Sequence, residues 1–397
     1  MCRRRICSGT TIPGPRPWPG FSPVSPADAA LKARLEFKGA IGDLSPVAAE
    51  KPTVNDIARH AGVSLATVDR VLNERPGVRS TTIAKVNQAI VDLGYVRDTA
   101  AANLARRRIY RLLFLLPDSG SELIAALMRQ IAAQAALLVT ERTRLEIRRT
   151  TAFDGRETAQ TLDDLRTAGS DRIDGVAILA PETPQIRDAI IRTRARGIAV
   201  VSIISDLPSS RRDHFIGIDN ISAGKTAARL MGRFLERKKQ SIAVIVGSRY
   251  ARDHLERRHG FDLTMAEDFP HLRVLPSIEA RASADLVFDG LQNAWRADNE
   301  IGGIYSSADD SQGLIRFLRG IHRKPVVIAH ELTPDNRKAL SERIFDAVIA
   351  QDLGHIVRSA VRLLRATVDS TPFNAPQERI GIDIYLRENL PAADFPL

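Results

Sequence analysis

From residue 110 onward, short apolar segments alternate with longer amphipathic ones. The apolar segments are RLLFLLP, VAILAP, IAVVSII, IAVIVGS, GGIYSS and PVVIAHE, and small or polar residues close them. Such continuous apolar runs are typical of strands that are buried on both faces of a parallel sheet. The segments between them, for example residues 121–140 and 223–236, have helical periodicity. The alternation predicts an α/β fold of parallel sheets with helices on both faces, and it is long enough for two lobes.

Positive charge is concentrated toward the N-terminal end of the chain. The net charge is +10, yet residues 1–111 hold 18 basic and 9 acidic side chains, whereas residues 112–397 hold 39 and 38. A small basic module joined to a nearly neutral body is typical of a nucleic-acid-binding domain attached to a domain with another role.

The basic module contains three short predicted helices. Thr53 is the expected N-cap of the first, which ends near His60, and Gly62 allows positive φ in the turn that follows. Ser64 caps the second helix, and a third is expected over residues 80–93. Two helices joined by a tight turn that contains Gly form a helix-turn-helix, whose second helix enters the major groove of DNA.

This module resembles the DNA-binding domain of the LacI/GalR (lactose-repressor) family of bacterial transcription regulators. The resemblance rests on the run AGVSLATVDRVLN, on the third helix, and on the LGY and NLA segments that follow it. It implies that Leu65, Ala66 and Arg70 face base edges, where Arg70 can bind guanine through two hydrogen bonds and the apolar pair can pack on thymine methyls. The remaining implied DNA contacts or helix caps are Thr53, Ser64, Thr67 and Asn73.

Asp69 departs from the family, which commonly has Ser at this position. A carboxylate beside phosphates is repulsive unless it pairs with a neighbour or accepts a cytosine amino proton. Either arrangement is compatible with the sequence.

Residues 99–108, TAAANLARRR, match the hinge helix of the family. That resemblance implies that Leu104 wedges into the minor groove at the centre of a palindromic site and kinks the DNA there. The alternative is an Ala-rich linker followed by solvated arginines. We expect Arg107 and Arg108 to contribute mainly to the salt dependence of DNA binding.

The body resembles the periplasmic sugar-binding fold that these regulators carry. The chain is therefore expected to combine a small all-α helix-turn-helix domain (residues 51–98), the hinge helix (99–108) and an α/β two-lobed periplasmic-binding-protein-like domain (109–390). Lobe 1 is expected over about residues 109–218 and 351–375, and lobe 2 over about 219–350 and 376–390.

Ligands in such sheets bind beyond the carboxyl ends of the strands. The resemblance implies that Arg257 clamps ligand hydroxyls or a carboxylate, that Glu331 accepts two sugar hydroxyls, and that Gln351 occupies a third strand end. The other implied ligand contacts are Ser205, Asp206, Asp309 and Asp310. A cleft with carboxylates, amides and one Arg suits a polyhydroxylated ligand, such as a sugar, a polyol or a sugar acid, because each hydroxyl both donates and accepts.

Several alternatives accompany these residues. Strand-end carboxylates often cap the next helix, which is the preferred interpretation of Asp219. Asp118 and Glu122 are secondary ligand candidates, since the loop PDSGSEL lacks an aromatic residue that could stack on a sugar ring. Enzyme motifs fail, because Pro334 stands where HExxH needs its second His and no GxSxG or dinucleotide fingerprint occurs.

Residues 1–50 are rich in Pro and are expected to be disordered, either as a basic arm that contacts DNA or as a dispensable extension. Cys2 and Cys7, the only cysteines, lie there without a nearby His, so no zinc site is expected. A structural disulfide is not expected either, because the cytoplasm is a reducing compartment. No cofactor is predicted. The chain has no apolar run of about 18 residues, which excludes a membrane span, and it lacks a signal-peptide core, so we expect it in the cytoplasm.

Together these features predict a sequence-specific transcription regulator. We expect a homodimeric repressor that binds a palindromic operator in double-stranded DNA and is controlled by a small polar effector in the cleft. The C-terminal segment ENLPAADFPL has no leucine heptad, which argues against a tetramer-forming tail. The alternative is a solute-binding protein of the periplasmic sugar-binding type without a transcriptional role, which the helix-turn-helix argues against.

Overall fold

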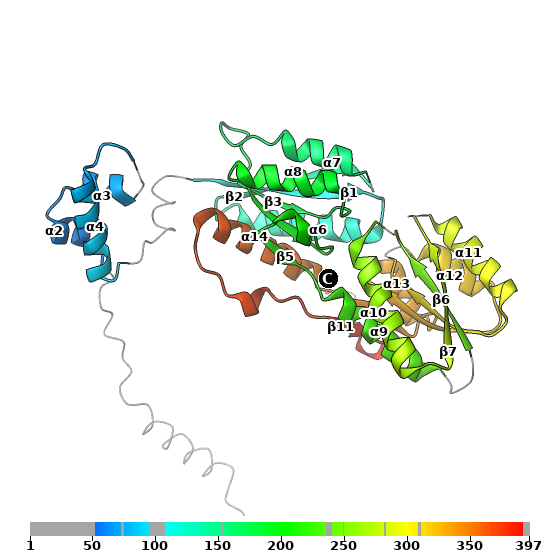
Figure 1. Cartoon of the computed structure of the whole chain (residues 1–397). Coiled ribbons are helices and arrows are strands. Elements are labelled where there is room, and N and C mark those ends of the chain that lie inside the picture. Colours follow the sequence, from blue (N-terminus) through cyan, green and yellow to red (C-terminus); the bar gives the residue numbers. More distant parts are fainter. Residues whose placement is uncertain are drawn as a thin grey trace, which may run out of the picture. The chain divides into compact units, whose positions relative to one another are not determined.

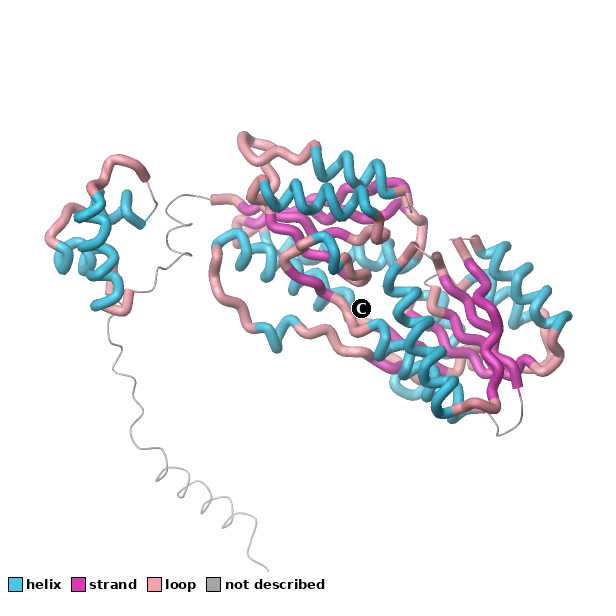
Figure 2. The backbone as a smooth tube through the Cα atoms, in the orientation of Figure 1, coloured by secondary structure: helices cyan, strands magenta, loops and turns pink. Residues whose placement is uncertain are grey.

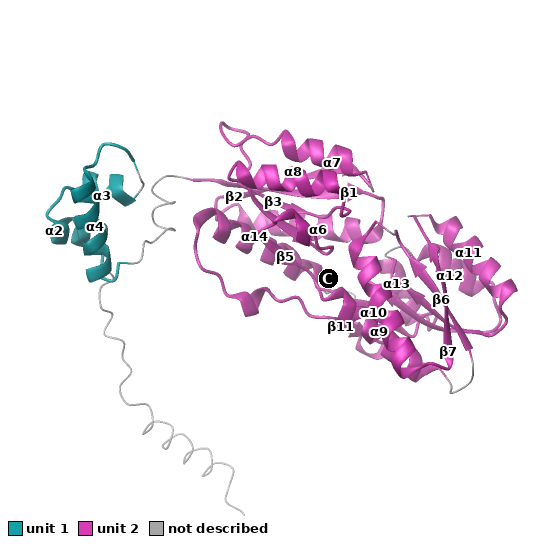
Figure 3. Cartoon of the chain, in the orientation of Figure 1, with its two compact units in different colours: residues 1–98 teal, residues 99–397 magenta. Residues whose placement is uncertain are grey.

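The computed structural model describes residues 52–72, 75–95, 108–152, 154–235, 240–248, 250–281, 283–308 and 311–391. The chain divides into two compact units, residues 1–98 and residues 99–397 (Figures 1 and 3). Each unit is described by itself below.

In the described residues of the first unit, three helices cluster together. They are α2 (Val54–Ala61), α3 (Leu65–Leu72) and α4 (Ser80–Asp92). Their shared core consists of Ile57, Ala58, Val68, Val86 and Ala89. Gly62 has a φ of 66° and ends α2 in the left-handed conformation, which glycine adopts without a steric penalty. The three predicted helices and the turn between the first two are confirmed.

The sheet of lobe 1 has five parallel strands. They are β1 (Tyr110–Asp118), β2 (Thr143–Thr151), β3 (Gly175–Ile178), β4 (Ala199–Ile203) and β5 (His214–Ile216), in the order β2-β1-β3-β4-β5. Helices α7 (Gly155–Asp163) and α8 (Pro184–Ala195) cover one face, and α6 (Glu122–Leu138) and α14 (Leu353–Asp369) cover the other (Figure 1). A short 3-10 helix, η1, spans Pro208–Ser210.

Alternate residues of β1 explain why both faces of this sheet are covered. Leu113 and Leu115 belong to the apolar cluster that includes residues of α7 and α8. Leu112, Phe114 and Leu116 belong to the cluster that includes residues of α6 and α14. Since successive strand residues point to opposite faces, a continuous apolar run requires helices on both sides.

The sheet of lobe 2 has six strands. They are β6 (Gln240–Val246), β7 (Leu272–Glu279), β8 (Ile301–Ser306), β9 (Val326–His330), β10 (Ala347–Ala350) and β11 (Asp383–Tyr385), in the order β11-β10-β9-β8-β6-β7. Only β11 runs antiparallel to its neighbour in this sheet. Helices α9 (Asn220–Phe234) and α10 (Arg252–Asp268) pack on one face, and α11 (Ala284–Ala297), α12 (Gln312–Arg319) and α13 (Pro334–Ser341) pack on the other.

The chain passes between the lobes three times. The connections are residues 217–219, 351–352 and 370–382, and the last contains the 3-10 helix η2 (Ala375–Glu378) (Figure 2). A further 3-10 helix, η3 (Arg387–Asn389), follows β11. Because α14 packs on the strands of lobe 1 while β11 pairs with β10, neither lobe is continuous in sequence.

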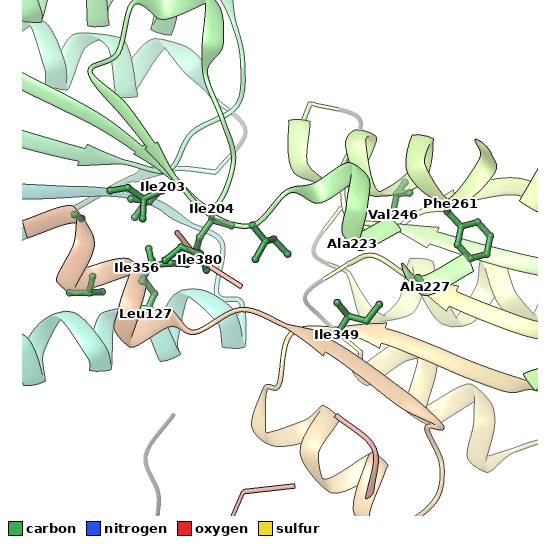
Figure 4. Packing of buried hydrophobic residues seen from close by; sticks show 14 of the residues in the cluster. Leu127, Ile203, Ile204, Ala223, Ala227, Val246, Phe261, Ile349, Ile356 and Ile380 are labelled. Carbon is green, nitrogen blue, oxygen red and sulfur yellow. The ribbon is translucent and has the colours of Figure 1, made fainter. Parts of the chain in front are cut away.

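One apolar cluster contains residues of both lobes. Figure 4 shows Leu127, Ile203 and Ile356 grouped in lobe 1, and Ala227 and Phe261 in lobe 2. This cluster lies on the inner faces of both sheets, next to the connections between the lobes. The carboxyl ends of β4, β9 and β10 meet at the same place, so the fold directs strand-end side chains toward one cleft.

Candidate functional site

The exposed face of α3 presents the side chains expected to contact bases. Leu65 is 51% exposed, and Ala66 and Arg70 are also exposed, whereas Val68 on the opposite face is buried in the three-helix core. The exposed Leu65 and Arg70 side chains suit contacts with a thymine methyl and with guanine, respectively.

The other DNA-facing candidates form helix caps. Thr53 donates from its backbone N and from Oγ1 to Asp56 Oδ2, at 2.8 and 2.7 Å. The backbone N of Thr67 donates to Ser64 Oγ at 3.2 Å, and the two hydroxyls lie 2.9 Å apart. These bonds satisfy polar groups at the starts of α2 and α3, so the caps hold the exposed face of α3 in place.

Asp69 is paired with a basic neighbour. Arg75 Nη1 lies 3.2 Å from Asp69 Oδ2. Of the two possibilities that the sequence allowed, the structure therefore shows pairing, and the carboxylate is partly neutralised on the face that would approach phosphates. Asn73, Leu104 and Arg107 lie outside the described residues, and their DNA contacts stay predictions.

Arg108 differs from the sequence-based expectation. Its Nη2 donates to Asp174 Oδ1 at 3.3 Å and its Nη1 to Asp369 Oδ1 at 3.4 Å, and its guanidinium lies over the Tyr110 ring, 5.1 Å from the centroid. Tyr110 Oη donates to Asp369 Oδ2 at 2.5 Å. Arg108 is thus not a solvated arginine but an anchor that ties the start of β1 to β3 and α14, because two mostly buried carboxylates hold it.

In the second unit, the structure brings together the three residues expected to bind ligand most directly. Arg257 Nη2 donates to Glu331 Oε1 at 2.9 Å, and Gln351 Nε2 donates to the same oxygen at 2.9 Å. Arg257 Nε also donates to Asn220 Oδ1 at 2.8 Å. Arg257 and Glu331 are 1% and 2% exposed, so this is a buried ion pair with additional hydrogen bonds.

Opposing effects act on the titration of this pair. Burial raises the pKa of Glu331, and the Arg257 charge and the Gln351 hydrogen bond offset only part of that rise. Burial opposes the charge of Arg257, but the carboxylates of Glu331 and Asp253 raise its pKa above the ordinary value. Gln351 Oε1 and Ser306 Oγ are buried without a hydrogen-bond partner among the described residues.

The cavity between the lobes has a different lining from the one expected. None of Arg257, Glu331 and Gln351 lines it, whereas Ser205 does. Its polar lining comes from the β1–α6 loop, the end of β4 and the start of α10, and its walls are mostly apolar. The polar and charged lining residues are Ser119, Ser121, Ser205, Asp253 and His254, and the apolar ones include Pro117, Leu179, Ile204 and Ala308.

The remaining predicted residues have structural partners or lie outside the described part. Asp206 binds Arg212 through Nη2 at 2.6 Å and Ser202 Oγ at 3.0 Å, within its own lobe and outside the cavity lining. Asp219 accepts the Ser222 backbone N at 3.0 Å, which confirms the helix-cap interpretation. Asp309 and Asp310 lie outside the described residues.

Asp253 and His254 are functional candidates that the sequence did not single out. Asp253 lies four residues before Arg257 on α10, so both face the same side, and that spacing was an available signal. Burial alone would raise the pKa of Asp253, but His254, Arg257 and hydrogen bonding with Ser205 lower it below the ordinary value, which keeps the carboxylate ionised. No sequence pattern marks His254.

The start of α10 joins the two lobes. Arg252 Nη1 donates to Glu182 Oε2 of lobe 1 at 2.7 Å, and the backbone N of Asp253 donates to Ser205 Oγ at 3.3 Å. Arg252 Nε also donates to Glu256 Oε1 at 2.7 Å. Asp253, which lines the cavity, is therefore adjacent in sequence to Arg252, which contacts the other lobe.

Two residues at the strand ends beside the cleft have left-handed backbones. Ile204 and Glu331 both have a φ of 64°. This conformation is strained, above all for a β-branched residue such as Ile204, and it persists only where the surrounding structure enforces it. The backbone N of Ile204 donates to Ile216 O at 2.9 Å, and that of Glu331 to Ile349 O at 2.7 Å, which holds both in place. Such strain is common at ligand sites.

Two further observations concern metal binding and membrane insertion. Within the described residues, no three His, Cys, Asp or Glu side chains gather closely enough to hold a metal ion. None of the helices in the described part of the chain combines the length and apolarity of a membrane-spanning helix.

Comparison with known families agrees with this geometry. Residues 53–98 match the family of bacterial regulatory proteins of the lacI type, and residues 112–371 match a periplasmic binding protein domain. The chain belongs to the LacI family. It combines the helix-turn-helix of that family with a two-lobed, periplasmic-binding-protein-like domain, as the sequence predicted.

Curated relatives of this LacI-family chain are transcription regulators. The maltose regulon regulatory protein MalI of Vibrio furnissii is 35% identical over 96 residues, which is 23% of this chain and 70% of that protein. The HTH-type transcriptional regulator RegA of Clostridium saccharobutylicum is 26% identical over 283 residues, which is 67% of this chain and 77% of that protein.

Solved structures share the fold of the second unit. The glucose-galactose binding protein GanP from Geobacillus stearothermophilus has a TM-score of 0.63 at 19% identity. The match covers 72% of this chain and 100% of that chain. A solute-binding protein from Burkholderia graminis in complex with D-arabinose has a TM-score of 0.63 at 22% identity, covering 71% of this chain and 96% of that chain. At these identities the likeness shows the fold alone.

Proposed function

We propose that this LacI-family regulator is a homodimeric repressor whose affinity for a palindromic operator is controlled by a small polar effector in the cleft of its second unit. The observation that carries the proposal is the exposed face of α3, where Leu65, Ala66 and Arg70 project above the buried Val68. A chain that contains both this face and a two-lobed cleft has the parts needed to read DNA and to sense a ligand.

The dimer follows from the geometry of DNA binding. A single α3 can contact only a few base pairs, and helix-turn-helix proteins gain specificity by placing two recognition helices on half-sites about one helical turn apart. A two-fold dimer therefore favours a palindromic operator. Binding to chromosomal DNA in turn favours a cytoplasmic site of action.

Control by ligand requires different ligand affinities in the two states of the protein. The start of α10 supports such a difference, because Arg252 contacts lobe 1 through Glu182 while Asp253 lines the cavity. A ligand held by Asp253 acts on the same helical turn that joins the lobes. A change in the lobe arrangement then moves lobe 1. Arg108 in lobe 1 anchors the segment that leads to the DNA-binding unit.

The alternative function is solute binding without a transcriptional role. The fold of the second unit supports it, but a solute-binding protein has no use for the cap-stabilised, exposed face of α3. The relatives described as transcription regulators also favour regulation over solute binding and over catalysis.

Selection of duplexes from a random library tests the DNA-binding part. The full chain should enrich a palindrome with half-sites about one turn apart, and the variant that lacks residues 52–108 should enrich none. Retention of duplex binding by the shortened chain would contradict the proposal. A ligand at 100 times its Kd should add about 2.7 kcal/mol to the stability of the second unit, which a thermal-shift screen detects.

A further inference from the structure

We propose that Asp69 is a specificity-determining residue of α3 that accepts a hydrogen bond from a cytosine amino group in the major groove. This inference rests on the proposed function, because it names a base pair that the same DNA-reading face selects. Each operator half-site then carries a C·G pair close to the base pair whose guanine Arg70 binds.

Asp69 lies in the middle of the exposed face of α3. It follows Leu65 by four residues and Ala66 by three, and residues at these spacings are neighbours on one side of a helix. Arg70 continues the same face, whereas Val68 is buried in the three-helix core. Since the Asp69 side chain is 55% exposed, its carboxylate reaches the surface that Leu65, Ala66 and Arg70 present to the bases.

Arg75 holds the carboxylate on this face without covering it. Its Nη1 donates to Asp69 Oδ2 at 3.2 Å, and its backbone N donates to Arg70 O at 2.8 Å, so both ends of Arg75 are tied to α3. Both side chains of the pair are more than half exposed. A carboxylate has about four acceptor positions, so Asp69 can accept from Arg75 and from a base at the same time.

Cytosine is the base whose major-groove edge suits a carboxylate best. The acceptors on these edges are guanine N7 and O6, adenine N7 and thymine O4, and all of them repel a carboxylate. The donors are the amino groups of adenine and cytosine. The adenine amino group stands beside the N7 acceptor of the same base, whereas cytosine has no acceptor on this edge. Asp69 therefore selects cytosine.

A half-site without this cytosine leaves the Asp69 carboxylate without a base donor. Binding removes water from the carboxylate, and lost hydration that no new hydrogen bond replaces raises the free energy of the complex. The phosphates repel the same charge on every sequence. Asp69 therefore weakens binding to unrelated DNA, and the cytosine amino group offsets this effect only at the operator, so the residue acts on specificity more than on affinity.

Selection of duplexes from a random library by the full chain tests the inference. The base pair that Arg70 reads is the one whose preference disappears in Arg70→Ala. We expect a C·G pair within about two base pairs of it, because neighbouring Cα atoms are about 3.8 Å apart and stacked base pairs about 3.4 Å apart. Asp69→Ser should reduce the preference for that pair by about tenfold, keep the other preferences and bind unrelated duplexes more tightly. Asp69→Asn should prefer adenine there, since an amide can bond both N6 and N7 of adenine.

Two controls separate base reading from a general effect of charge. Asp92→Asn removes an exposed carboxylate of α4 that accepts from Gln88 Nε2 at 2.7 Å, and it should leave every base preference unchanged. N4-methylcytosine at the selected position still pairs with guanine, but a methyl group replaces its N–H in the major groove. This base should weaken binding of the wild type by about tenfold and leave binding of Asp69→Ser unchanged.

The outcomes distinguish this inference from the proposed function. A palindrome whose base preferences are the same in the wild type and in Asp69→Ser, with the fold intact by circular dichroism, would overturn the inference while the proposed function stands. Equal weakening of Asp69→Ser on the operator and on unrelated duplexes would mean that Asp69 only holds Arg75 near phosphates, and it would overturn the inference as well. If the full chain enriches no palindrome, the DNA-binding part of the proposed function fails and the inference fails with it.

Discussion

Arg252 Nη1 and Glu182 Oε2 lie 2.7 Å apart and join the two lobes at the rim of the cleft. Both side chains are about one-third exposed, so water screens the pair and its contribution to stability is small. Its position matters more than its strength, because it links the start of α10 to the loop that follows β3.

This position predicts the effect of removing the interlobe pair. Glu182→Gln should change the unfolding free energy of the second unit by less than about 1 kcal/mol. It should weaken effector binding by up to about fivefold, since this arrangement of the lobes loses one contact. A double-mutant cycle with Arg252→Met, read by calorimetry, measures the coupling. Equal losses in the single and double variants identify a coupled pair, whereas additive losses would contradict the link.

The exposed face of α3 predicts a loss of sequence discrimination. Arg70→Ala should reduce the preference for the operator over a scrambled duplex by about 1–3 kcal/mol. Arg59→Ala is the matched control, because Arg59 is an exposed arginine of α2 that pairs with Asp56 rather than projecting from α3. Anisotropy titrations at fixed salt compare the two. A similar loss of preference in both variants would mean that Arg70 acts only through charge.

The anchoring of Arg108 predicts an effect on stability rather than on salt dependence. Arg108→Ala leaves Asp174 and Asp369 with fewer partners and should cost about 1–3 kcal/mol of unfolding free energy. The slope of log K against log salt for DNA binding should stay unchanged, because the guanidinium is held by carboxylates. A phosphate contact would instead reduce the slope by about 1.

The buried pair of Arg257 and Glu331 predicts a strongly asymmetric mutational response. Glu331→Gln removes the carboxylate that the buried Arg257 guanidinium bonds directly, leaving only the Asp253 charge nearby, and should lower the unfolding free energy of the second unit by about 3–5 kcal/mol. The double variant Arg257→Met, Glu331→Leu should recover part of this loss, since it removes both charges of the pair while the buried Asp253 loses its Arg257 neighbour. Chemical denaturation of the wild type, the single variant and the double variant measures their unfolding free energies. A double variant no more stable than the single variant would contradict this interpretation of the pair.

His330 predicts that stability falls in weak acid. Burial lowers the pKa of His330 well below its ordinary value, and the neighbouring Arg257 and His254 add to the effect. The unfolded chain therefore takes up a proton near pH 6.5 while the folded chain does not, so this part of the stability is present above that pH and is lost as the pH falls toward the folded pKa. The slope of the unfolding free energy against pH should approach about 1.4 kcal/mol per pH unit in this range.

The variant His330→Gln isolates that contribution. Gln can keep a hydrogen bond with Tyr305 Oη, which lies 3.0 Å from His330 Nε2, but it does not titrate. The difference between the two proteins should therefore shrink or reverse between pH 7.5 and 5.5 in denaturation curves. Parallel curves over that range would show that His330 does not contribute.

Local sequence patterns were sufficient for most of the helices and strands. The caps at Thr53 and Ser64, and Gly62 between them, act over a few residues, so the start of each helix can be predicted from the chain itself. The strands at the centres of the sheets are continuous apolar runs for the same reason that they are buried on both faces. The edge strand β2, TRLEIRRTT, escaped prediction because a strand with an exposed edge and face needs no apolar run.

The residue types of the cleft also came from the sequence, but their partners did not. Sequence position predicts Glu331 and Gln351 at neighbouring strand ends, whereas Arg257 lies inside α10, and only the packed structure shows that the three bind one another and leave Asp253 and His254 to line the cavity. The same holds for Arg108, which the sequence predicts to contribute to the salt dependence of DNA binding and which the structure places between two carboxylates. Helix caps and apolar periodicity depend on residues close together in the sequence, so they can be predicted from it. Charge pairing depends instead on which distant carboxylates the fold places within a few ångströms.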